Sequence, residues 1–237
     1  MNVATLAKSL NGYATWTFSQ GDLAVWRHYR TMGICAALSA HWIKHHANDG
    51  SLANVLGGGG VGPLKVGTLK EIALLHRTVS TTGDEQRENL KLWLQMHDII
   101  SLNTSHRVTV TNHRLNRDVV QAQSRTSEVL ASGSFPNIEN DLVTAMRKHN
   151  TCYARINFGG TFLGRGAGHA VAVWLGQPSW SDHGDALFFD PNYGEYWFKK
   201  KEDFFRFFPL YYRATYRSFP FSFDKNWELL PCAKKVR

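Results

Sequence analysis

The stretch Met32-Gly33-Ile34-Cys35-Ala36-Ala37-Leu38-Ser39-Ala40-His41-Trp42 places a cysteine between a glycine and a run of helix-favouring apolar residues. The pattern predicts a helix that begins at Cys35 and ends near Ala47, before Asn48-Asp49-Gly50. A cysteine in the first turn lies at unpaired N–H groups and the positive end of the helix dipole, which stabilise a thiolate. Cys35 is therefore a candidate nucleophile; the alternative is a small residue that packs a helix start.

Two later segments supply partners for such a nucleophile. His169 heads an alternating apolar run that predicts a buried strand to Leu175, and Asp190 ends a second predicted strand, 186–190. If these strands are neighbours and antiparallel, His169 and Asp190 lie at the same edge of a sheet. Asp190 could then accept one ring N–H while the other nitrogen takes the proton of Cys35. Asn192, in the turn after this strand, is the reserve candidate for the third role.

Three blocks of sequence together resemble the YopT/AvrPphB family of bacterial cysteine proteases. They are Gly33-Ile34-Cys35-Ala36-Ala37-Leu38-Ser39 with Trp42, Gly168-His169-Ala170-Val171-Ala172, and Phe189-Asp190-Pro191-Asn192-Tyr193-Gly194-Glu195-Tyr196. The resemblance follows the family's motif order over roughly residues 30–200, and the third block is the most specific. It implies a papain-like fold, with Cys35 as nucleophile, His169 as general base and Asp190 as the carboxylate that orients it. It also implies an effector or toxin that acts on a protein inside a target cell, with no metal or cofactor.

One position departs from the papain-like pattern. These enzymes usually carry Gln or Asn five or six residues before the cysteine, as a donor to the oxyanion, and here those positions hold Arg30 and Tyr29. We therefore expect the backbone N–H of Cys35 to act with one substitute donor. The candidates are the side chains of Tyr29 and Arg30 and a backbone N–H in the same approach.

The chain as a whole predicts a single α+β domain over residues 1–237, with residues 1–25 as a candidate export or accessory segment. A helical N-terminal half carries the nucleophile helix, which packs on a mostly antiparallel sheet formed by the second half. Further helices are expected at 68–78, 84–97, 116–131, 137–148 and 201–208. Strands are expected at 13–19, 107–111, 152–158, 169–175, 186–190, 196–199, 214–223 and 227–231. Residues 56–63 predict a glycine loop beside the cleft rather than a phosphate-binding loop, because no Lys-Ser/Thr follows.

Composition limits the cellular compartments in which the protein is expected to act. No run of 18 apolar residues occurs, the N-terminus lacks the pattern of a signal peptide, and the three cysteines form no C-x-x-C pair. We expect a protein that is secreted without a cleavable signal peptide and acts in the reducing cytosol of a target cell. A secretion chaperone is a further candidate partner that the resemblance implies.

The net charge of +8 is concentrated near the C-terminus. Residues 199–237 carry ten Lys/Arg against four Asp/Glu, together with eleven aromatic residues. We interpret this segment as a strand-rich closing part of the fold with aromatic side chains inside and cations outside. Nucleic acid is not an expected partner, and charge alone would give a weak attraction to anionic membranes.

Three classes of function fit these observations. A thiol protease is favoured, and a glutamine deamidase or an acyltransferase would use the same thiolate on another acyl group. A cell-wall amidase is less favoured because it usually has a much shorter Cys–His spacing than the 134 positions that separate His169 from Cys35. A non-catalytic module that binds through its basic face is the third class. The sequence does not identify the substrate.

Overall fold

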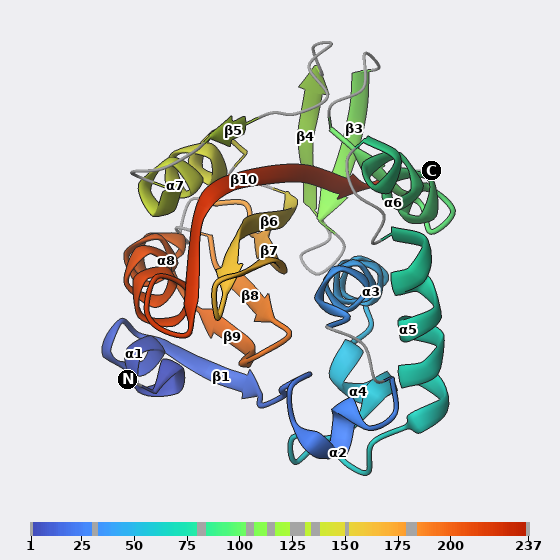
Figure 1. Ribbon diagram of the computed structural model, residues 1–237. Coiled ribbons are helices and arrows are strands. Elements are labelled where there is room, and N and C mark those ends of the chain that lie inside the picture. The colour runs from blue at the N-terminus through green and yellow to red at the C-terminus, as the bar shows by residue number, and fades with distance from the viewer. Residues whose placement is uncertain are drawn as a thin grey trace.

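The structure is a computed structural model that describes residues 2–29, 33–79, 84–102, 107–112, 117–123, 131–133, 138–149, 152–178 and 184–235 (Figure 1). The helices are α1 (Val3–Ser9), α2 (Leu23–Trp26), α3 (Cys35–Ala47), α4 (Leu52–Leu56), α5 (Val66–Val79), α6 (Asp84–Gln95), α7 (Ile138–Lys148) and α8 (Lys201–Tyr216). The strands are β1 (Gly12–Trp16), β2 (Ile99–Ser101), β3 (Arg107–Asn112), β4 (Arg117–Gln123), β5 (Ala131–Gly133), β6 (Tyr153–Phe162), β7 (Arg165–Leu175), β8 (Ala186–Asp190), β9 (Gly194–Phe198) and β10 (Phe221–Lys234).

A central antiparallel sheet separates two helical layers. Its strand order is β1-β9-β8-β7-β6-β10-β2, with β5 pairing to β10. In Figure 1, α3, α4, α5 and α6 lie on the right of this sheet, and α1, α7 and α8 lie on the left. Each layer buries its own apolar cluster against the sheet, and the two clusters use alternate side chains of the same strands. This is the helix-plus-antiparallel-sheet layout expected for an α+β domain.

Helix α3 is buried on almost all sides, from Ala36 to Ile43. It packs directly on β7, where the Ser39 hydroxyl donates to the carbonyl of Ala170 (3.0 Å). Its Trp42 ring lies parallel to Phe189 of β8, with ring centroids 6.0 Å apart. Because small residues occupy the first turns, the helix approaches the strands closely enough for Cys35 to reach the sheet.

Two sequence predictions are wrong. The helix expected at 116–131 is instead the strand β4 in its described part, and β4 pairs with β3 in a hairpin. The pair Val119-Val120 is β-branched and favours a strand once a partner strand is present. Residues 124–130 lie outside the described part of the chain.

The second error concerns the aromatic segment. The helix expected at 201–208 continues through Pro209 to Tyr216, and the strand expected at 214–223 is confined to the start of β10. A proline inside a helix costs roughly 3 kcal/mol. Burying each large aromatic side chain returns about 1.5–3 kcal/mol, and Tyr211, Tyr212 and Tyr216 beyond the proline are all fully buried. The free energy gained by burying these rings therefore exceeds the cost of the proline inside the helix.

Nine of the eleven aromatic residues in the C-terminal segment are buried, which confirms that they face inward. Phe219 is the clear exception, with 89% of its surface exposed. None of the described helices is both long and apolar enough to cross a membrane.

Two histidines of α3 lie next to each other, of which His41 is buried against α6 and His45 is half-buried. The His41 ring packs on Trp93 with centroids 4.8 Å apart and on His45 at 6.1 Å. Burial first, and then the nearby charge of Lys44, lowers the pKa of His41 to about 3 and that of His45 to about 4. These side chains are therefore neutral in the folded protein at pH 6.

We predict that the folded state loses stability as the pH falls from about 6.5 towards 4. In that range the unfolded chain binds protons that folded His41 does not, so the free energy of unfolding drops by up to about 1.4 kcal/mol per pH unit for such a group. Urea unfolding at several pH values measures this slope. The His41→Leu variant should show a shallower slope, and equal slopes in the two proteins would contradict the prediction.

Candidate active site

Cys35 lies at the first position of α3 and remains partly exposed. Burial alone would raise the pKa of its thiol. The charge and hydrogen bond of His169, the backbone N–H of Ala170 and the positive charge of Arg155 outweigh burial, so the pKa of Cys35 is lowered. Arg155 is 2% exposed in β6 and faces the α3 layer, so its charge acts on the thiolate through the protein interior.

His169 lies in β7 opposite Phe158 of β6 and is 6% exposed. Its Nε2 is 2.9 Å from Oδ1 of Asp190, which leaves Nδ1 for Cys35. The ring of Tyr216 stacks on the imidazole, with centroids 5.0 Å apart and planes at 29°. Burial lowers the pKa of His169, but the charges of Asp190 and Cys35 and the hydrogen bonds to both outweigh burial and raise it. The site therefore favours a thiolate–imidazolium pair.

Asp190 ends β8 and has no exposed surface. Its Oδ1 accepts from His169 and from the backbone N–H of Asn192 (2.7 Å). Its Oδ2 accepts the hydroxyl protons of Tyr216 (2.6 Å) and Tyr211. Burial and the neighbouring Asp190 charge raise the pKa of both tyrosines well above the usual range, so both hydroxyls remain donors.

Gln20 connects the backbone next to Cys35 to the turn that follows Asp190. Its Oε1 accepts the backbone N–H of Ile34 (2.8 Å), the residue before Cys35, and its Nε2 donates to Oδ1 of Asn192 (2.8 Å). The backbone N–H of Gln20 also donates to the carbonyl of Pro191 (2.7 Å). Because Ile34 fixes the oxygen end of the amide, the NH₂ group must face Asn192, and one of its two hydrogens remains for another acceptor.

Of the remaining candidates named from the sequence, Tyr29 and Asn192 make contacts that differ from those expected. The Tyr29 hydroxyl donates to the backbone carbonyl of Gln20, and burial followed by the charge of Cys35 raises the pKa of Tyr29 to about 12. Asn192 binds Gln20 and donates its NH₂ group to the Tyr216 hydroxyl (3.1 Å). Arg30 lies outside the described residues. Asn192 therefore supports the Asp190 loop, and the Tyr29 proton is already committed.

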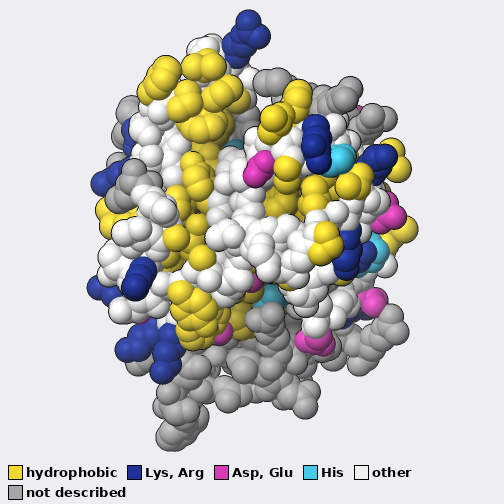
Figure 2. Space-filling view, turned by 90° about the horizontal axis from the view of Figure 1, so that it is seen from below, with side chains coloured by type: hydrophobic (Ala, Val, Ile, Leu, Met, Phe, Trp, Pro, Cys, Tyr) yellow, Lys and Arg dark blue, Asp and Glu magenta, His cyan; other side chains and the backbone are white. Residues whose placement is uncertain are grey.

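The glycine loop lies beside the site. Gly58 and Gly59 line a pocket of about 880 Å³ together with Phe18, Asn192 and Tyr193. Gly59 has φ +56, and a Cβ there would lie 1.6 Å from the carbonyl oxygen of Thr17, so only glycine fits. Residues of α1 and α2 also line this pocket. Figure 2, which views the molecule from below, shows hydrophobic side chains gathered in several patches on that face.

Among the residues that the structure describes, no group of three or more His, Cys, Asp or Glu side chains is placed to hold a metal ion.

A helix-borne cysteine that meets an imidazole on an antiparallel sheet is the arrangement of the papain-like cysteine hydrolases. Residues 7–217 match the peptidase family described as Yersinia/Haemophilus virulence surface antigen, and the chain belongs to this family. The resemblance inferred from the sequence motifs is thereby confirmed.

Relatives and a solved structure agree with this assignment. The chain is 30% identical to the cysteine protease YopT of Yersinia pestis over 179 residues, which cover 74% of this chain and 48% of YopT. It is also 30% identical to the cysteine protease yopT1 of Yersinia enterocolitica serotype O:8 over 180 residues, with the same coverage. The chain thus spans about half the length of these relatives. The crystal structure of the Pseudomonas avirulence protein AvrPphB shares the fold, with a TM-score of 0.50, 12% identity and coverage of 87% of this chain and 95% of that one.

The sequence analysis missed three residues of this site: Gln20, Tyr211 and Tyr216. Gln20 lies fifteen positions before Cys35 instead of five or six. Tyr211 lies between the helix expected at 201–208 and the strand expected at 214–223, and Tyr216 lies within that expected strand. Nothing in their local sequence marks them, because their role depends on contacts with distant residues.

We predict that iodoacetamide alkylates Cys35 well below pH 8 and leaves the other two cysteines unlabelled until the protein unfolds. Burial raises the pKa of Cys152 to about 12 and that of Cys232 well above its usual range, whereas the pKa of Cys35 is lowered. Mass spectrometry of the labelled peptides at several pH values measures this difference. Equal, slow labelling of all three cysteines would mean that Cys35 is not activated.

Proposed function

We propose that this chain is a thiol protease in which Cys35 is the nucleophile, His169 the general base and acid, and Asp190 the group that orients the imidazole. The observation that carries the proposal is the contact of Cys35 with a buried His169 whose Nε2 is fixed by Asp190. This geometry is the one that nucleophilic catalysis by a thiolate requires. The membership of this chain in a peptidase family supports the same reaction.

The proposed reaction has two halves. The Cys35 thiolate attacks the carbonyl carbon of a substrate amide, a C–S bond forms, and the carbonyl oxygen becomes an oxyanion. The C–N bond then breaks as the proton on His169 Nδ1 passes to the leaving nitrogen, which gives a thioester. Water next gives a proton to His169 Nδ1 while its oxygen attacks the thioester carbon, and loss of the C–S bond restores the thiolate and the imidazolium.

The oxyanion needs two donors. The backbone N–H of Cys35 is the first, because it is at the open start of α3. For the second we propose Nε2 of Gln20, which has one hydrogen in excess of its bond to Asn192 and belongs to the side chain that holds Ile34. This takes the place of the Gln or Asn that papain-like enzymes carry nearer to the cysteine. Arg30 stays a candidate from the sequence, outside the described residues.

The substrate in this proposal is a protein of a target cell into which the chain is delivered. The cysteine proteases YopT and yopT1 support this class of substrate. Work in a reducing cytosol suits a chain whose Cys35, Cys152 and Cys232 are all free thiols. A secretion chaperone and a weak attraction to anionic membranes belong to the same proposal, and the net charge of +8 favours the second.

We predict that the protein cuts one or a few proteins in a lysate of eukaryotic cells and that Cys35→Ala abolishes the cuts. Mapping new N-termini by mass spectrometry, together with Gln-to-Glu conversions, measures both peptide hydrolysis and deamidation. Cys152→Ala, which removes a buried thiol away from the site, is the matched control and should retain cleavage. Deamidation without new N-termini would replace the protease with a deamidase, and no Cys35-dependent change of either kind would contradict the proposed function.

We also predict that Gln20→Glu lowers kcat by about 100- to 1000-fold, the usual loss when one oxyanion donor is removed. Glu keeps an oxygen that can accept from Ile34 N–H but has no NH₂ donor, so the start of α3 should keep its place. The Cys35 alkylation rate tests this and should change by only a few-fold. If kcat falls by less than tenfold, the second donor is another group.

A further inference from the structure

One face of helix α3 carries three side chains that reach different parts of the sheet. Cys35, Ser39 and Trp42 follow one another at spacings of four and three residues, which places them in one row along the helix. Cys35 contacts His169 of β7, and the Ser39 hydroxyl donates to the carbonyl of Ala170 in the same strand (3.0 Å). The row ends at Trp42, which is 1% exposed. The place of Cys35 therefore depends on what holds the other two side chains.

Trp42 is held by Glu195 of β9. Its indole N–H donates to Oε2 of Glu195 (2.6 Å), and Oε1 of the same carboxylate accepts the hydroxyl proton of Thr15 in β1 (2.6 Å). A buried indole N–H needs a hydrogen-bond acceptor, and a carboxylate is a strong one. Trp42 and Glu195 both stand in the sequence blocks that resemble the protease family, although neither belongs to the Cys-His-Asp set.

Glu195 also lies in a cross-strand row next to Asp190. It pairs with Phe189 of β8 on one side and with Trp16 of β1 on the other. The rings of Trp42 and Trp16 both lie nearly parallel to the ring of Phe189, with centroids 6.0 and 5.9 Å from it. Because Phe189 directly precedes Asp190, the same packed unit joins α3 to the strand that carries the aspartate.

The turn before β9 is closely covered by the segment that follows β1. Gly194 has φ +97, and a Cβ there would lie 2.1 Å from the carbonyl oxygen of Trp16, so only glycine fits. Four residues further on, the backbone N–H of Gln20 donates to the carbonyl of Pro191 in the same turn (2.7 Å). The turn is thus fixed on both sides, and the strand that follows it offers α3 a firm point of attachment.

The geometry of a helix converts a small shift at Trp42 into a shift at Cys35. At 1.5 Å per residue, Cys35 lies about 6 Å from Ser39 along the axis, and Trp42 lies about 4.5 Å away in the opposite direction. If the helix pivots at Ser39, a movement of about 1 Å at Trp42 moves Cys35 by about 1.3 Å. A misplacement of about 1 Å at a reacting group can lower a rate by about 100-fold.

We propose that Glu195 is a positioning residue whose carboxylate fixes Trp42 and thereby sets the place of Cys35 against His169. Glu195 acts through α3, and Cys35 remains the group that reacts. This inference rests on the proposed function and deepens it, because it assigns to a further residue part of the alignment that the thiolate–imidazolium pair requires.

The first test is the pH profile of Cys35 alkylation in Glu195→Ala. Without its attachment α3 shifts, Cys35 moves away from His169, and the midpoint pH of alkylation by iodoacetamide should rise by at least about 0.5. Cleavage of peptides from a Lys-C digest of eukaryotic lysate, followed by mass spectrometry, should slow by at least about tenfold. A lower melting temperature with the alkylation midpoint and the cleavage rate unchanged would mean that the contact only stabilises the fold, and would overturn the proposal.

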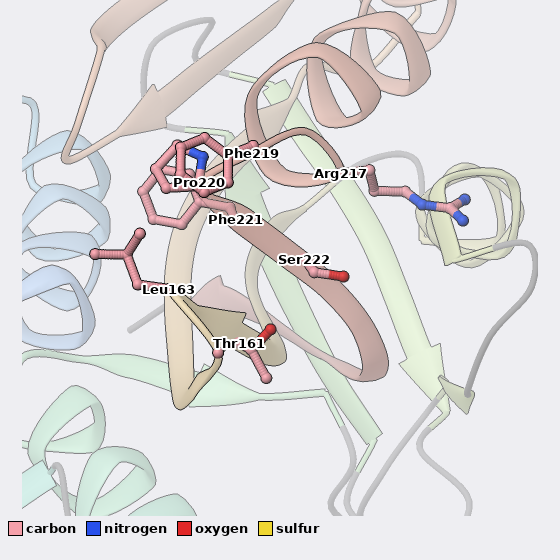
Figure 3. A pocket seen from close by; sticks show the side chains of 8 residues that line it. Thr161, Leu163, Arg217, Phe219, Pro220, Phe221 and Ser222 are labelled. Carbon is pink, nitrogen blue, oxygen red and sulfur yellow. The ribbon is translucent and has the colours of Figure 1, made fainter.

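Three further variants serve as controls. Glu195→Gln keeps an oxygen that accepts from Trp42, and its NH₂ group can donate to the exposed Thr15 hydroxyl, so it should behave as the wild type. Thr15→Val is the matched control, because it removes only the other hydrogen bond of the same carboxylate and should also have no effect. Phe219→Ser changes a side chain that is 89% exposed, beside Leu163 at one end of a surface pocket (Figure 3), and controls the alkylation assay. Losses in Glu195→Gln or Thr15→Val as large as in Glu195→Ala would contradict the role of the Trp42 contact.

A double-mutant cycle tests whether Glu195 acts through Trp42. Trp42→Phe removes the indole N–H but keeps an aromatic ring next to Phe189, so it should raise the alkylation midpoint as Glu195→Ala does. The double variant should be no more affected than Glu195→Ala, whereas additive shifts would overturn the proposed route.

Alkylation does not require peptide hydrolysis, so the two proposals can fail separately. A raised alkylation midpoint in Glu195→Ala, with no cleavage by the wild type, would support the positioning role and contradict the protease. Cleavage by the wild type, with the midpoint and the rate unchanged in Glu195→Ala, would support the protease and overturn the positioning role.

Discussion

The structure depends on the buried carboxylate of Asp190. A charge without exposed surface is tolerated only when it is hydrogen-bonded on every side, and removing one partner of such a group costs about 3–5 kcal/mol. Here the donors come from three different parts of the chain: β7, the turn after β8, and α8. The same carboxylate that organises the site therefore also attaches α8, with Tyr211 and Tyr216, to the sheet.

The charge at Asp190 propagates to Cys35 through a short series of contacts. Asp190 holds His169, whose positive charge favours the thiolate, and the Tyr216 ring covers the imidazole and limits its exposure. On the other side, Asn192 holds Gln20, and Gln20 holds the backbone just before Cys35. Cys35, the proposed nucleophile, is thus positioned from both ends of one hydrogen-bonded loop. Arg155 in β6 adds a further positive charge that favours the Cys35 thiolate. Its side chain is buried, and burial lowers the pKa of its guanidinium.

Sequence reasoning identified the residues that occupy the ends of regular elements. Cys35 starts a helix, Asp190 ends a strand, and His169 begins the apolar part of β7, so local patterns and the family motifs both marked them. Gln20 and Tyr211 carry no such mark, because their partners lie more than a dozen residues away and only folding brings them together. The length of α8 was also unpredictable locally, since Pro209 signals a break that only the buried aromatic packing overcomes.

The central claim is that Asp190 and Cys35 hold His169 in its protonated form. The most direct measurement is ¹⁵N NMR of the histidine rings at pH 7.5, with the His169 signals assigned by their loss in His169→Gln. The account predicts that both ring nitrogens of His169 carry protons in the wild type, and that His169 is largely neutral in Asp190→Asn, which lacks the negative charge. A neutral His169 imidazole in the wild-type protein at this pH would contradict the account.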